Sequence, residues 1–161
     1  MVSFLKVAAV AVAAGVIIFA AYGIYAIEAG KGTFTGAVPS AFAVNGRAYA
    51  FTYTATTQAE RETGLMNRKI TNTTTMLFAF PSFGVWSFWM YDTNSSLDII
   101  WLNATGSSAT VVFLVTSAPP CYNSSSCTVY TPPSAADFVI EAKAGFAAAN
   151  AIEVGTAVKF S

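Results

Sequence analysis

The distribution of apolar and polar positions divides the chain into one long apolar run near its start and a series of short strand-like segments after it. Residues 7–27 are 21 positions without a charge, and about 20 such residues are enough for a helix to cross a bilayer. Residues 47–57 alternate between small or aromatic side chains and threonines, and strands prefer such residues. Several shorter apolar runs follow, separated by turn residues. This pattern predicts a mainly β domain behind an apolar segment.

Two local motifs predict the position of a hairpin and the start of a helix. Asn45-Gly46 between apolar runs is a strong signal for a two-residue hairpin turn. Thr57 and Glu60 have the spacing of a capping box, so a short helix is expected to run to about residue 67. The predicted strands are 42–44, 48–54, 75–80, 85–91, 96–102, 110–115, 138–142 and 157–160, and the second predicted helix is 145–151. We expect a mainly β (α+β) fold, a compact antiparallel β barrel or sandwich with two short helices.

The apolar run predicts one N-terminal transmembrane helix. Lys6 precedes the run, so the positive-inside rule leaves the short amino end in the cytoplasm and places the rest outside the cell. A cleaved signal peptide is the competing interpretation, but its apolar core is usually only about 7–15 residues long. We expect an anchor over 1–29, a linker over 30–40 that can also add an edge strand, and an extracytoplasmic domain over 41–161.

The composition excludes several classes of function. The 161 residues suffice for one domain, only 10% of them are charged, and the formal net charge is zero. Binding of nucleic acid normally requires a basic patch, so no nucleic-acid partner is expected. The chain contains no histidine, which removes Ser-His and Cys-His catalysis and the commonest ligand of transition metals. We therefore expect no enzyme activity and no cofactor.

Two sequence features predict an exported protein. Asparagine-linked glycosylation requires an Asn-x-Ser/Thr sequence, and such sites lie on surface loops of exported proteins. The four candidate sites are Asn72, Asn94, Asn103 and Asn123. Cys121 and Cys127 are the two cysteines of the chain, and an even pair in an exported domain predicts a disulfide. This disulfide would close a short loop only.

Several short blocks also occur in an order that is known from one family. The blocks are Gly64-Leu65-Met66 with Arg68, Met76-Leu77-Phe78 with Phe80, Phe88-Trp89-Met90 with Thr93, Leu97-Asp98-Ile99, Pro119-Pro120-Cys121, Ile140-Glu141 and Ala144-Gly145-Phe146. Over roughly 49–160 the chain thereby resembles the domain of unknown function 192 family, whose members are exported or membrane-associated. The resemblance implies a fold and a location, but no settled activity. Tyr91 and Asp92 stand where the family has lysine and asparagine, Ser96 replaces a proline, and Thr156 replaces an aspartate.

Asp92 and Asp98 are the first candidates for a site, because they flank an Asn-Ser-Ser turn between apolar runs. Two carboxylates at a suitable distance are the catalytic pair of glycosidases, and together with Thr93 and Asn94 they offer oxygen ligands for calcium. No second feature supports either site. Turn chemistry explains the same residues if Asp92 and Asn94 bond their own backbone.

A carboxylate that opens a buried strand needs partners. We expect Asp98 to pair with backbone amides or with Arg68, in a structural polar cluster that Glu141 can join. The functional alternative is that this cluster forms the floor of a small pocket lined by Trp86, Trp89 and Met90. The candidate binding residues are Arg68, Trp86, Trp89, Asp92, Asp98 and Glu141.

Together these features predict a non-catalytic accessory or structural subunit of a membrane or cell-surface assembly, for which a filament is one form. Its expected partners are membrane lipid, through the N-terminal helix, and other proteins or further copies of the chain. The alternative is an extracytoplasmic domain that binds a small molecule, a sugar or a metal ion.

Overall fold

The computed structural model describes residues 32–161, so the predicted anchor over 7–27 lies outside the described residues. Within 32–161 no helix has the length and apolar character needed to cross a bilayer. The strands are β1 (Ala41–Val44), β2 (Arg47–Ala50), β3 (Tyr53–Ala55), β4 (Thr75–Gly84), β5 (Phe88–Trp89), β6 (Leu97–Thr105), β7 (Ser108–Ala118), β8 (Val129–Tyr130), β9 (Ala136–Lys143) and β10 (Ala157–Phe160). The helices are α2 (Gln58–Thr63) and α3 (Phe146–Ala149). The prediction of a mainly β domain with two short helices is thus confirmed for this part of the chain.

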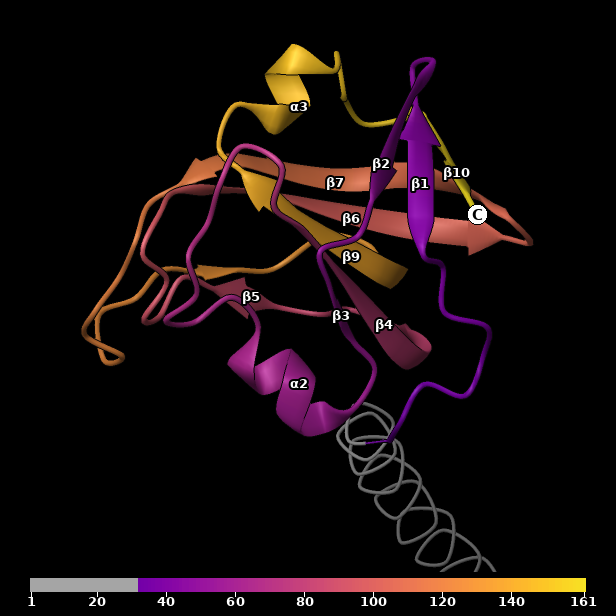
Figure 1. Ribbon diagram of the computed structural model, residues 1–161. Coiled ribbons are helices and arrows are strands. Elements are labelled where there is room, and N and C mark those ends of the chain that lie inside the picture. The colour runs from indigo at the N-terminus through magenta and orange to yellow at the C-terminus, as the bar shows by residue number, and fades with distance from the viewer. Residues whose placement is uncertain (1–31) are drawn as a thin grey trace, which may run out of the picture.

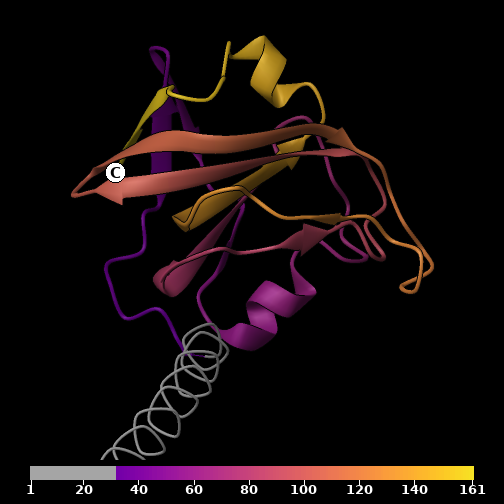
Figure 2. The same ribbon diagram turned by 180° about the vertical axis from the view of Figure 1, so that it is seen from behind.

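Eight strands form one sheet in the order β2-β1-β10-β7-β6-β9-β4-β3, and β5 pairs with β8 separately. Neighbouring strands of the eight-stranded sheet are antiparallel, except β3 and β4, which are parallel. The sheet curls, with β1, β2 and β10 turned away from the plane of β4 and β9, as both views show (Figure 1, Figure 2). The architecture is a half-barrel and not a two-sheet sandwich.

The connection between β2 and β3 draws the two edges of the curled sheet toward each other. Next to β2, the Phe51 amide donates to the Ser40 carbonyl at 3.0 Å, and the following Thr52 amide donates to the Thr75 carbonyl of β4 at 2.9 Å. The predicted single strand over 48–54 is therefore two strands. The strand is interrupted after β2 because the chain crosses there from one edge of the sheet to the other.

The two local motifs have the predicted structures. Asn45 and Gly46 both have positive φ, at 47° and 79°, as a type I′ turn requires. The Thr57 side chain accepts from the Glu60 amide, and the Glu60 carboxylate accepts from the Thr57 amide, which completes the capping box. The α2 helix ends at Thr63 with Gly64, whose φ is 47°, as its C-cap, so the predicted end near residue 67 is wrong.

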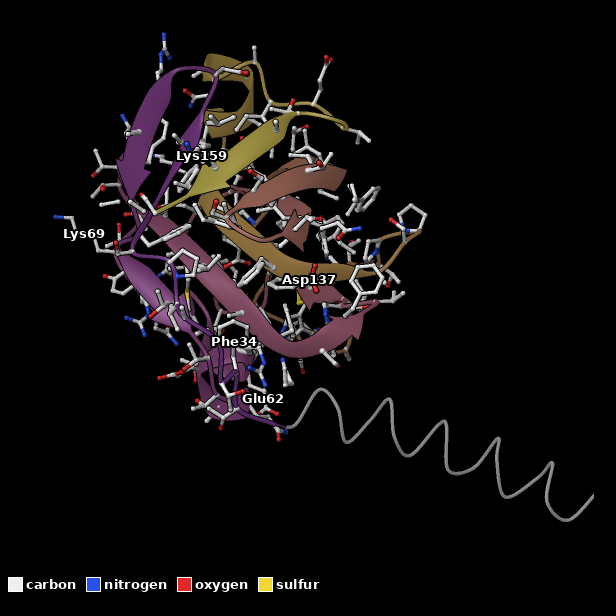
Figure 3. The ribbon with its side chains drawn as sticks, turned by 90° about the vertical axis from the view of Figure 1, so that its right-hand side faces the viewer. Phe34, Glu62, Lys69, Asp137 and Lys159 are labelled. Atoms are coloured by element: carbon white, nitrogen blue, oxygen red, sulfur yellow. A yellow bond between two sulfur atoms is a disulfide. The ribbon has the colours of Figure 1, made fainter. Side chains whose placement is uncertain are left out.

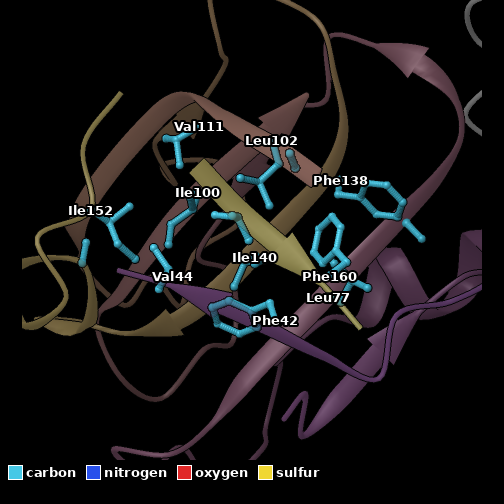
Figure 4. Packing of buried hydrophobic residues seen from close by; sticks show 14 residues of the cluster. Phe42, Val44, Leu77, Ile100, Leu102, Val111, Phe138, Ile140, Ile152 and Phe160 are labelled. Carbon is cyan, nitrogen blue, oxygen red and sulfur yellow. The ribbon is translucent and has the colours of Figure 1, made fainter. Parts of the chain in front are cut away.

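The sheet buries side chains on both of its faces, and successive residues of a central strand alternate between two hydrophobic clusters. The first cluster lies inside the curl and contains Phe42, Leu77, Ile100, Ile140 and Phe160 among others (Figure 4). The second contains Met76, Phe78, Ile99, Trp101 and Val139, and lies on the face that α2 and β5 cover (Figure 1). Because both faces are covered, central strands such as β6 carry almost continuous apolar runs.

Further segments differ from the predicted elements, and the predicted strand over 85–91 contains only the two-residue strand β5. The predicted end of a strand at residue 80 is wrong, since β4 continues to Gly84 through a register irregularity that accommodates Pro81. Residues 32–40 form no strand. Instead Phe34 packs on the first cluster, with its ring 5.6 Å from that of Phe138, and its amide donates to the Thr56 carbonyl at 2.8 Å.

The predicted disulfide is present between Cys121 and Cys127, and it closes an exposed loop. The four asparagines of the candidate glycosylation sites are exposed. Their exposure meets the steric requirement for a glycan, while the modification itself stays a prediction.

Candidate functional site

A pocket of about 390 Å³ opens between α2, the segment around β5 and the outer face of the sheet. α2 and β5 lie on the same side of the sheet in Figure 1, and Glu62 of α2 lies at the end of the domain where Phe34 enters (Figure 3). The lining side chains are mostly apolar and come from α2 and the turn after it, from β4, from residues 86–89 and from β9. We call this space the Glu141 pocket, after the residue on its floor.

Aromatic rings form the wall of the Glu141 pocket. The Trp86 ring stacks on that of Phe80, with centroids 4.3 Å apart and planes within 5°. The Trp86 indole nitrogen donates to the Ala136 carbonyl at 2.9 Å, which fixes the ring. Phe88 packs edge-on against Phe78 at 4.8 Å. Trp89 is 40% exposed at the mouth.

Arg61 of α2 closes one side of the pocket and is held by backbone carbonyls. One of its terminal nitrogens donates to the carbonyls of Thr56 and Ala79, at 2.7 and 3.0 Å. The other donates to the carbonyl of Gly32 at 2.6 Å, and the guanidinium lies 5.3 Å from the centroid of the Phe80 ring. Arg61 therefore anchors α2 and the entering chain segment to β4.

Glu141 lies on the floor of the pocket, in the C-terminal half of β9. It stands opposite Met76 of β4 and Ile99 of β6 in the register of the sheet, and it is only 4% exposed. Its carboxylate has no hydrogen-bond partner among residues 32–161, and each of its oxygens keeps some accessible surface, which the pocket provides. Burial raises the pKa of Glu141 to about 8, because a charged carboxylate is poorly stabilised away from water.

The other polar side chains of the pocket bond within the protein. Gln58 donates to Glu62, and the hydroxyls of Thr63 and Thr93 donate to the carbonyls of Ala59 and Tyr91. The Ser87 hydroxyl pairs with that of Thr131. Among the buried side chains that line the described part of the pocket, Glu141 thus has the one polar group without a protein partner. The indole nitrogen of Trp89 also makes no hydrogen bond there, but that side chain is 40% exposed.

The predicted site residues separate into two groups. Trp86, Trp89 and Glu141 come together in the pocket. The prediction that Met90 lines it is wrong, since Met90 is buried in the second cluster. The predicted cluster of Asp98 with Arg68 and Glu141 is wrong, because Asp98 and Glu141 project from opposite faces of the sheet. Asp98 is paired with Ala142 of β9, the residue after Glu141. Successive residues of a strand point to opposite faces, and paired residues point to the same face.

Asp98 has a structural role, and its carboxylate accepts hydrogen bonds from backbone amides. Of the two predicted partners of Asp98, backbone amides or Arg68, the backbone amides are the ones present. One oxygen accepts from the Ser117 amide at 2.9 Å and the other from the Ala147 amide at 2.8 Å. These bonds fix the end of β7 and the start of α3 to β6. Both oxygens are therefore occupied, which is unfavourable for a catalytic pair or a calcium site with Asp92.

Arg68 and Asp92 also serve the framework. Arg68 donates to the Gly64 carbonyl at 3.0 Å and covers the ring of Tyr53, 4.3 Å from its centroid. The predicted side-chain turn at Asp92 is wrong, since its side chain makes no hydrogen bond among the described residues. Its backbone instead links two loops, through a donor bond to the Cys121 carbonyl and an acceptor bond from the Asn67 amide, both 2.8 Å.

The sequence reasoning missed Phe80, Phe88 and Arg61 as pocket residues. Aromatic residues in apolar strands resemble ordinary core residues, and Arg61 resembles a solvated residue on a short helix. A usable signal for Glu141 was present, because a single charge interrupts the apolar run of β9. Residues 32–161 contain no group of three or more acidic, cysteine or histidine side chains able to hold a metal ion.

Comparisons with known proteins agree with this fold. A solved protein of unknown function from Novosphingobium aromaticivorans is 27% identical, with a TM-score of 0.62, over 76% of this chain and 84% of that one. A protein from Sinorhizobium meliloti, provisionally described as a transcription regulator, is 23% identical with a TM-score of 0.62, over 78% of this chain and 98% of that one. At that identity the likeness shows the fold alone.

A search of curated proteins found no match. The model of one protein family matches residues 42–160, which include every strand of the half-barrel except the first residue of β1. The chain therefore belongs to the domain of unknown function 192 family, a family described only as uncharacterised.

Proposed function

We propose that this domain binds a small organic ligand in the Glu141 pocket, and that it does so without catalysing a reaction. The proposal rests on one observation, the buried carboxylate of Glu141, which has no partner among the described residues and opens into an aromatic pocket. A buried acidic group without a partner lowers stability. Asp98, equally buried, has both oxygens bonded, so this sequence is able to satisfy such a group where structure alone requires it.

The volume and lining of the pocket support the same proposal. Its volume of about 390 Å³ lies in the range of roughly 300–1,000 Å³ that is common for small-molecule sites. Such sites are mainly apolar and aromatic, with a few polar groups that fix orientation. The wall of Phe80, Trp86, Phe88 and Trp89 around one carboxylate has this composition.

A ligand screen by thermal unfolding tests the proposal on the full-length protein. The screen contains aromatic and aliphatic fragments of four kinds: amines, alcohols, carboxylic acids and monosaccharides. A ligand at a hundred times its dissociation constant adds about 2.7 kcal/mol to the free energy of unfolding. Trp89→Ala should remove the effect, since Trp89 lines the mouth. Phe83→Ala is the matched control, because Phe83 is 55% exposed and outside the pocket lining. If no fragment stabilises the wild type more than the Trp89→Ala variant, the proposed function fails.

A second candidate function is that of an accessory subunit in a membrane or surface assembly. The apolar side chains of Phe83, Val85, Trp89 and Val129 are each at least 40% exposed, and Trp89 and Val129 are paired neighbours on β5 and β8. Exposed apolar groups near one another favour contact with another protein. Extraction in mild detergent followed by mass measurement tests this candidate, and a lone monomer would count against it.

We also propose that the domain lies outside the cytoplasm and that the segment 7–27 anchors it to the membrane. The disulfide and the four exposed candidate glycosylation sites support it. Protease treatment of intact cells should then degrade the domain, whereas protection of the domain would place it on the inner side.

A further inference from the structure

The Glu141 pocket offers a ligand one buried polar group without a protein partner and several aromatic faces, with the exposed Glu62 carboxylate and the Trp89 indole at its rim. Gln58, Thr63, Ser87 and Thr93 already bond within the protein, so a ligand with many hydroxyls would find few free partners. A sugar is therefore a poor match for this lining. A ligand with one polar head and an apolar body fits it better, because the head can reach Glu141 while the body contacts the rings.

The side chains that line the pocket favour a positive charge on the polar head of the ligand. An ionised Glu141 attracts a cation, and the faces of aromatic rings attract cations within about 6 Å of their centroids. Arg61 does not neutralise Glu141, since its nitrogens donate to the carbonyls of Thr56, Ala79 and Gly32. An anionic head would meet the carboxylate and the negative faces of the rings, and both would repel it.

Resting on the proposed function, we propose that the Glu141 pocket selects organic ammonium ions. The ammonium N–H groups donate to the carboxylate oxygens of Glu141, and the rings of Trp86, Phe88 and Trp89 surround the apolar body of the ligand. A salt bridge of this kind is favourable here because it provides the partner that the buried carboxylate lacks in the protein itself.

Ammonium binding is coupled to release of a proton. Without ligand, burial raises the pKa of Glu141 to about 8, so the group is mostly neutral at pH 7, and an ammonium ion binds the ionised form. The other charged residues that line the pocket are Arg61 and Glu62, both from α2. Arg68 lies over Tyr53 on β3, separated from β9 by β4. With a pKa of about 8, the ionised fraction rises about 50-fold between pH 6 and pH 8, and affinity for the ammonium ion rises with it.

Isothermal titration of the full-length protein in detergent, with benzylamine and with benzyl alcohol, tests the proposal. The two probes have nearly the same shape and differ in the charge of the head. Benzylamine should bind about 50-fold more tightly at pH 8 than at pH 6, and the heat at pH 7 should depend on the buffer because a proton is released. Benzyl alcohol should bind at least tenfold more weakly than benzylamine at pH 8. Protein-free micelles provide the blank titration.

Two variants locate the effect. Glu141→Gln should lower the affinity for benzylamine at least tenfold at pH 8 and abolish its dependence on pH. Glu62→Gln removes a carboxylate from the mouth of the same pocket and should change the affinity by less than about twofold. If Glu141→Gln does not fold, the pH profile and the buffer dependence of the wild type still decide the matter.

The contrary outcomes separate this inference from the proposed function. If benzyl alcohol binds as tightly as benzylamine at pH 8, or if the affinity for benzylamine does not change with pH, ammonium selection is wrong. Binding of only sugars or acids in the fragment screen would also overturn ammonium selection while leaving the ligand-binding function intact. If no fragment binds in a manner that depends on Trp89, both ideas fail.

Discussion

Replacing Glu141 by glutamine should raise the stability of the protein above about pH 5 and remove most of its dependence on pH. The pKa of Glu141 is about 8 in the folded protein, against an ordinary value of 4.5. Below pH 4.5 the group is protonated in both the folded and the unfolded state, and its contribution to stability is fully present. As pH rises the unfolded state loses its proton first, so stability falls until the folded-state pKa is reached.

The magnitude follows from the interval between the two pKa values. From 4.5 to about 8 the free energy of unfolding falls by about 1.4 kcal/mol per pH unit, or roughly 5 kcal/mol in all. Between pH 5.5 and 8 the loss is about 3 kcal/mol. With an m value of about 2 kcal/mol per molar urea, the unfolding midpoint of the wild type should fall by about 1.5 M. The midpoint of the glutamine variant should remain nearly constant.

Urea unfolding monitored by tryptophan fluorescence measures this effect at half-unit steps from pH 5 to pH 8.5. The range is well suited because the chain has no histidine and its two cysteines form a disulfide, so few other groups titrate there. Glu62→Gln is the matched control, since Glu62 is an exposed residue of the same pocket, and it should follow the wild type. Parallel curves for the wild type and Glu141→Gln would refute the reasoning.

Three further predictions concern the framework. Asp98→Asn replaces a carboxylate that accepts from two backbone amides, and because an amide group can accept through only one atom, we expect a loss of about 2–4 kcal/mol in urea unfolding; a loss below about 0.5 kcal/mol would contradict this. Replacing both Cys121 and Cys127 by serine opens a loop with a sequence separation of 6 and should lower stability by about 2 kcal/mol, whereas an unchanged midpoint would show that the disulfide does not constrain the unfolded chain. Thr57→Ala removes the capping box of α2 and should lower stability by about 1 kcal/mol, with Thr57→Ser as the control that keeps it.

The elements that could be predicted from the sequence are those determined by residues close together in the chain. The turn at Asn45-Gly46, the capping box at Thr57 and the disulfide each depend on residues no more than six positions apart. Each has a specific chemistry, such as the tolerance of asparagine and glycine for positive φ. Their structures therefore follow from local energetics and need no knowledge of the tertiary fold.

The elements that could not be predicted depend on the register of distant strands. Asp98 bonds the amides of residues 19 and 49 positions away. Because β6 is apolar on both faces, its sequence has no alternation to show that Asp98 points away from Glu141. The same applies to β3, whose parallel pairing with β4 depends on the curl of the whole sheet.

The candidate site was partly predictable for a related reason. Glu141 interrupts the apolar run over 138–142 of β9, and tryptophans are rare enough to attract attention, so these residues were found. Phe78 and Phe80 both line the pocket and both belong to the second buried cluster, and in the apolar run of β4 they look like ordinary core residues. Whether an aromatic residue faces a pocket or a packed interior depends on what covers the sheet, which a single strand does not reveal.

Arg61 lines the Glu141 pocket and donates to the carbonyl of Gly32. One side of the pocket therefore lies next to the first described residue of the chain. Only residues 28–31 separate Gly32 from the predicted bilayer-spanning segment, and even a fully stretched tether of that length reaches about 18 Å. If that segment spans a bilayer, the tether keeps Gly32, and with it the Arg61 side of the pocket, close to the layer of lipid headgroups. The proposed ligand would then reach the pocket from the membrane surface as well as from open solution.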